Sequence, residues 1–121
     1  MPPSKIAKSH RHLNGLREEL IDLIHKGEGK AEKYLNGKPE ALREILGALE
    51  TVREAVSLLL ANPKTLTRLV HDLVVEVAQY GQGDLKSGEG EERSRTLLLA
   101  AARDARDQAA RILGNSSLYP D

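Results

Sequence analysis

Two histidines and several carboxylates are of the residue types that a metal site in a helical bundle requires. Asp22 and His25 are three residues apart, so they would lie on the same face of a helix. Bundle metal sites use an acid three residues before a histidine on each of two helices. This chain has one such pair, which His71, Asp72 and Glu76 on another helix could face. Because the leucine pattern places Asp22 on the outer side of its helix, we expect a solvated surface without metal or cofactor.

Other catalytic chemistry has little support in the sequence. There is no cysteine, which excludes thiol nucleophiles, thiolate metal sites and disulfides. No serine lies in a glycine-flanked turn after a strand. The glycine-rich stretch 81–90 follows no predicted strand and lacks the Gly-Lys-Ser or Gly-Lys-Thr ending of a phosphate-binding loop. We therefore predict a non-enzymatic protein without catalytic residues. A bundle enzyme or metal-binding protein that uses Glu18, Asp22, His25 and His71 remains an alternative function, ranked after the nucleic-acid alternative described next.

The first helical turns carry the most one-sided charge in the chain. Four basic residues precede the first acidic one, Glu18, and they are Lys5, Lys8, Arg11 and Arg17. Such a segment can contact the phosphates of nucleic acid. However, no aromatic residue lies near it to stack on bases, and the net charge of the chain is zero. A nucleic-acid-associated accessory protein is therefore the first alternative function.

These candidate residues would be held by helices, because the apolar residues recur at helical spacing. The clearest pattern has six of them separated by three or four positions, at Leu42, Ile45, Leu49, Val52, Val56 and Leu59. We predict helices over residues 4–25, 39–61, 63–80 and 90–113. Gly27 and Gly29 are expected to end the first helix, and residues 30–35 to form a short extra helical turn. The valine-rich run 69–78 could also be a strand, but it would have no partner strand.

The predicted fold class is all-α, an antiparallel four-helix bundle with one short extra helical turn. A chain of 121 residues suits a single domain over residues 1–121. Because Phe and Trp are absent, the core must be built from Leu, Ile, Val and Ala, which favours helix-on-helix packing. We expect tails at residues 1–3 and 115–121 and a flexible loop at 81–90. The tight link at Asn62-Pro63 predicts that the two helices it joins pack on each other as a hairpin.

One misplaced valine and two rows of small residues indicate a protein–protein contact surface. Val75 falls on the polar face of its helix, where it has no intramolecular role. The small residues let another helix approach closely, unless the core uses them all; they are Ala41, Ala48, Ala55, Ala102, Ala105 and Ala109. We predict a small assembly or adaptor protein that acts through helix faces and binds itself, as a homo-oligomer, or another helical protein.

The sequence also bears on location. No apolar run is long enough to span a membrane, and the N-terminus lacks the apolar core of a secretory signal. We therefore expect a cytoplasmic protein with no membrane partner.

Overall fold

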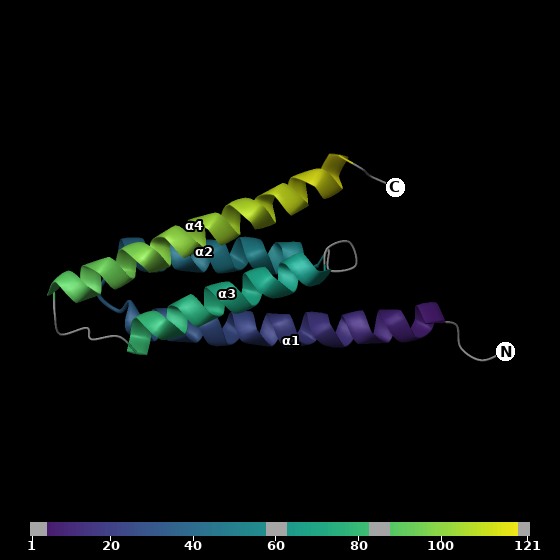
Figure 1. The fold of residues 1–121 in the computed structure, drawn as a ribbon, viewed down its shortest axis with the longest axis horizontal. Helices are drawn as coiled ribbons and strands as arrows, with labels where there is room; N and C mark the ends of the chain where they lie inside the picture. The colour runs from purple at the N-terminus through teal and green to yellow at the C-terminus, as the bar shows by residue number, and fades with distance from the viewer. Residues whose placement is uncertain (1–4, 58–62, 83–87, 119–121) are drawn as a thin grey trace.

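The computed structural model describes residues 5–57, 63–82 and 88–118 (Figure 1). Four helices account for nearly all of them: α1 (Lys5–Tyr34), α2 (Pro39–Val56), α3 (Pro63–Gln82) and α4 (Gly88–Leu118). No strand occurs in these ranges, and the valine-rich run 69–78 is helical. The predicted all-α, four-helix class is therefore confirmed.

The helices form two pairs, α1 with α2 and α3 with α4, that stack on each other. In Figure 1, α1 and α3 run across the view in one direction, and α2 and α4 run in the other. Contact is most extensive between α2 and α4 and between α1 and α3, which are helices that run the same way. Among the helix pairs that touch, contact is least extensive between α2 and α3, although we expected these two to form a close hairpin. Between α1 and α4 there is no contact within the described residues.

Two glycines allow α1 and α3 to approach each other closely. A Cβ atom on Gly27 would lie 3.2 Å from Cγ2 of Val74, and a Cβ atom on Gly81 would overlap the ring of Tyr34. Both contacts join residues that are the same distance apart along the chain. The two helices therefore run in parallel with a constant register.

The core lies where the four helices meet and is almost entirely aliphatic, as the absence of Phe and Trp requires. Tyr80, which is 3% exposed, is its aromatic member. The largest side chains that are fully buried come from every helix and from the turn after α1; they are Leu20, Ile24, Leu35, Ile45, Leu49, Leu66, Leu73 and Leu98. Together with the fully buried Val52, Val56 and Val70, those on α2 and α3 repeat at the three- and four-residue spacing on which the helix predictions depended.

The first helix does not end at residue 25, as predicted, but continues through Gly27 and Gly29 to Tyr34. A glycine in a helix interior costs about 1 kcal/mol relative to alanine. Burial of a leucine side chain contributes about 1.5–3 kcal/mol, and Leu35, directly after α1, is fully buried. Burial of Leu35 therefore outweighs the cost of the glycines in the helix. The short helical turn expected at residues 30–35 is largely the last part of α1. The turn that follows α1 contains Gly37, which has a φ of 93°.

Other boundaries of the predicted helices also differ from those in the structure. α4 passes through Gly114 and ends at Leu118, so the tail expected from residue 115 is wrong for its first four residues. α2 ends at Val56 rather than at residue 61, and residues 58–62 lie outside the described part. Within the expected loop at 81–90, the ends belong to α3 and α4, and residues 83–87 lie outside the described part.

The glycines give a direct test of the α1–α3 contact. Gly29 is an exposed helical residue with open space around it, so Gly29→Ala should raise the free energy of unfolding by about 0.5–1 kcal/mol. Gly81→Ala should lower it by about 1–3 kcal/mol, because the added methyl overlaps the Tyr34 ring. Urea unfolding followed by circular dichroism measures both. Stabilisation by both substitutions would contradict the close approach of α1 and α3.

Candidate functional site

A buried carboxylate joins three segments at one end of the bundle. Glu91, in the first turn of α4, is 8% exposed. Its Oε1 atom accepts a hydrogen bond of 2.5 Å from the Tyr80 hydroxyl and lies 2.7 Å from Nζ of Lys38. Its Oε2 atom accepts a hydrogen bond of 3.0 Å from Nη1 of Arg95. Glu91 thus connects the turn before α2, the end of α3 and the start of α4.

These contacts change the acidity of two groups. The hydrogen bond from Lys38, followed by that from Tyr80, lowers the pKa of Glu91 below its usual value. Burial, followed by the hydrogen bond to Glu91, raises the pKa of Tyr80 to about 12. At neutral pH the cluster therefore contains an ionised carboxylate, a neutral phenol and two cations.

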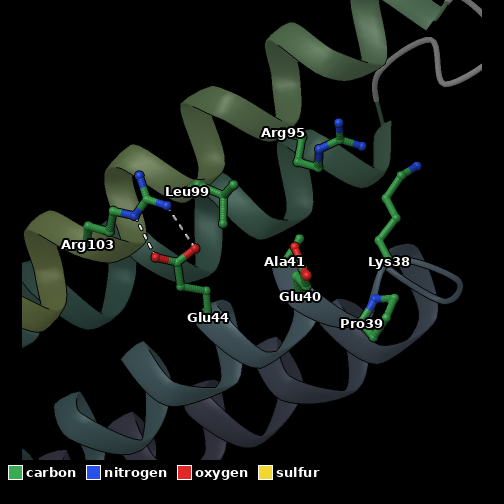
Figure 2. Close-up of a pocket in the computed structure, with 8 residues that line it drawn as sticks. All are labelled: Lys38, Pro39, Glu40, Ala41, Glu44, Arg95, Leu99 and Arg103. Atoms are coloured by element: carbon green, nitrogen blue, oxygen red, sulfur yellow. Dashed lines mark hydrogen bonds and ion pairs between the residues drawn. The ribbon is translucent and has the colours of Figure 1, made fainter.

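Next to this cluster, a hollow of about 430 Å³ opens between α2 and α4 (Figure 2). Glu44 and Arg103 close one end as a bidentate pair, with Nε–Oε1 and Nη2–Oε2 distances of 2.5 and 3.0 Å. Lys38 and Arg95 stand at the other end, and Leu99 lies between the two ends on α4. The hydrogen bond from Arg103 lowers the pKa of Glu44. The hollow therefore combines apolar surface with charged groups at both ends.

A second hollow, of about 270 Å³, lies in the outer groove between α3 and α4. We call this surface the α3–α4 groove; it is lined by Arg68, Leu69, Asp72, Leu73, Val75, Glu76, Ala101, Asp104, Ala105 and Gln108. Val75 is 47% exposed, as its position on the polar face predicted. Leu97, four residues before Ala101 and on the same side of α4, is 61% exposed. They are the two large apolar side chains that stand exposed in the described part of the chain.

Sequence reasoning missed Leu97 and the buried position of Glu91. The signal for Leu97 is the run Leu97-Leu98-Leu99, because three consecutive residues of a helix cannot all face one core. For Glu91, the spacing of four residues to Arg95 indicates one ion pair. It gives no indication of Tyr80 or Lys38, which come from other segments.

The alanines that were expected at an interface lie inside the bundle. Ala41 and Ala105 are 8% and 5% exposed, and Ala48, Ala55, Ala102 and Ala109 are at most 1% exposed. All six pack in the core of this chain, and only small exposed parts of Ala41 and Ala105 line the two hollows. Of the seven predicted interface residues, Val75 alone is exposed.

The two histidines of the predicted metal or enzyme alternative lie apart, because Glu18, Asp22 and His25 line one hollow and His71 lines another. Nδ1 of His25 lies 3.2 Å from Nη2 of Arg53 on α2. His71 lies instead beside Glu19, Asp22 and Lys26 on α1. No group of three or more histidines and acids in the described residues could hold a metal ion. The convergence of Glu18 and Asp22 with both histidines, which the sequence left open, is therefore absent from the described residues.

The basic N-terminal segment is only partly described. Arg17 is half-buried, and its Nη1 atom donates a hydrogen bond of 3.4 Å to Oδ1 of Asn14. The side chains of Lys5, Lys8 and Arg11 lie outside the described part, although their backbone belongs to α1. Phosphate contact by these residues stays a prediction.

Comparisons with known proteins do not assign a function. No protein-family model, curated protein or solved structure matches this chain. Among the described helices, none is long and apolar enough to cross a membrane.

Proposed function

We propose that this protein is a small, non-enzymatic assembly or adaptor protein that self-associates through the α3–α4 groove. One observation carries the proposal: the exposed Val75 lines the groove from α3, and the exposed Leu97 lies one helical turn before the groove residue Ala101 on α4. Single exposed apolar residues are common on protein surfaces and need no explanation. Two that lie in and beside one groove offer a partner helix two apolar contacts.

The shape and charge of the groove suit a helix as the partner. Side-chain ridges of one helix pack into grooves of another, and the hollow leaves space for such side chains. Charged residues of both signs, Arg68, Asp72, Glu76 and Asp104, surround the apolar positions. A polar rim around an apolar centre is the usual composition of a protein–protein interface.

Light scattering on the purified chain tests this proposal. We expect a mass above that of one chain, and we expect Val75→Lys or Leu97→Lys to shift it to the monomer, because each places a charge in the apolar contact. Ala110→Lys is the matched control, because Ala110 is exposed on α4 outside the groove lining. A wild-type chain that is monomeric at its highest soluble concentration would refute self-association.

A further inference from the structure

The hollow between α2 and α4 has the features of a small-ligand site. Its volume of about 430 Å³ falls in the range of about 300–1,000 Å³ that such sites occupy. Ala41 and Pro39 on α2 and Leu99 on α4 supply its apolar surface. Figure 2 shows Arg103 at one end and Arg95 and Lys38 at the other, with Leu99 between them. A molecule lying over Leu99 would therefore meet a cation at either end.

The three cations keep hydrogen-bond donors that their partners do not use. Lys38 and Arg95 share the single carboxylate of Glu91, and Arg103 uses one edge of its guanidinium group on Glu44. A guanidinium group has five N–H donors and an ammonium group has three, so donors remain on every one of these side chains. An oxyanion could accept them without breaking the existing pairs.

The start of α2 adds to the positive potential of this hollow. Lys38 is the N-cap residue, and its side chain makes no capping hydrogen bond. The N-terminal end of a helix carries a partial positive charge and unpaired backbone N–H groups. Against this, Glu40 and Glu44 line the same hollow, and their charges oppose an anion.

We propose that the hollow between α2 and α4 binds a small molecule that carries a carboxylate or phosphate group on a compact apolar body. The oxyanion accepts hydrogen bonds from Arg103, and the apolar body covers Leu99 and Ala41 towards the Lys38 and Arg95 end. This site is separate from the α3–α4 groove. Its occupation does not depend on self-association.

Titration of the labelled full-length chain, followed by nuclear magnetic resonance, tests the proposal. The probes are phenyl phosphate, benzoate and inorganic phosphate. We expect saturable shifts at Ala41 and Leu99 with at least one aromatic probe, and weaker binding of inorganic phosphate, which lacks the apolar body. Binding of only one aromatic probe would support the proposal and identify the oxyanion. Equal affinity for inorganic phosphate, or no saturable shift with either aromatic probe, would overturn it.

Two substitutions at the closed end should change the affinity in opposite directions. Arg103→Gln removes a charged donor and should weaken binding by about tenfold. Glu44→Gln removes the competing carboxylate and should tighten binding. Arg111→Gln, an exposed position on the same helix outside the lining, should change nothing. Both closed-end side chains are partly exposed, so the fold should tolerate their replacement, and circular dichroism checks this. Equal affinity in the wild type and both closed-end variants would overturn the site.

Discussion

Leu35→Ala is expected to lower the free energy of unfolding by about 2–5 kcal/mol, the range for a leucine truncated in a packed core. Leu35 is fully buried, and its backbone closes the end of α1. Its N–H group donates to the Ala31 carbonyl at 2.9 Å, and its carbonyl accepts from the Lys38 N–H group at 2.9 Å. The substitution therefore removes core contacts at the turn that carries Lys38.

Urea unfolding monitored by circular dichroism measures this loss. Lys33→Ala is the matched control, because Lys33 is exposed in the last turn of α1 and its replacement should change stability by no more than about 0.5 kcal/mol. If Leu35→Ala cost no more than Lys33→Ala, the segment after Gly29 would not be docked on the core. Residues 30–35 would then form a separate helical turn, as Gly27 and Gly29 led us to expect from the sequence.

The helices could be predicted from the sequence because each buries one stripe of apolar residues, and a stripe at 3.6-residue spacing is visible without knowledge of its partner. The end of α1 could not be predicted so well. Gly27 and Gly29 are unfavourable locally, but α1 needs a small residue at position 27, where Val74 of α3 comes close. That requirement arises only when α1 and α3 lie side by side. Tertiary packing therefore overrides the low helix propensity of Gly27 and Gly29.

The candidate sites were harder to predict because they depend on which helices are neighbours. The exposed position of Val75 followed from the pattern of its own helix. Rows of alanine indicate close approach, but they do not show whether the approaching helix belongs to the same chain. In this chain all six alanines are buried among its own helices. Tyr80 and Lys38 likewise meet Glu91 only because of how α3 and the turn before α2 pack against α4.

Glu91→Gln is expected to lower the free energy of unfolding at neutral pH by about 1.5–3 kcal/mol, the range for hydrogen bonds to a charged group. The substitution leaves Lys38 and Arg95 without the negative charge that they share. Glu92→Gln is the control, because the Glu92 side chain is 73% exposed and its replacement removes only one long ion pair, of 4.0 Å, with Arg95. Equal stability of the two variants would show that the Glu91 cluster does not hold α4 in place.

The effect of Glu91 should also depend on pH, with a sign fixed by its lowered pKa. The folded state binds the Glu91 proton more weakly than the unfolded state, whose pKa is near 4.5. The stability that the carboxylate contributes is therefore present above that pH and is lost as the pH falls through the lower, folded-state pKa. The wild type and Glu91→Gln should thus differ at pH 7 and converge in acid, as measured by urea unfolding across the acid range.

The contribution of Tyr80 to the free energy of unfolding should show the opposite pH dependence and be lost at alkaline pH. Its pKa rises from 10.0 to about 12 in the folded protein, so its contribution is complete below pH 10 and is lost as the pH rises towards 12. Tyr80→Phe removes this alkaline loss while keeping the buried ring, although it costs the hydrogen bond to Glu91 at neutral pH. The stability gap between the wild type and Tyr80→Phe should therefore narrow between pH 10 and 12. A gap that stayed constant over this interval would mean that the phenol is not buried against Glu91.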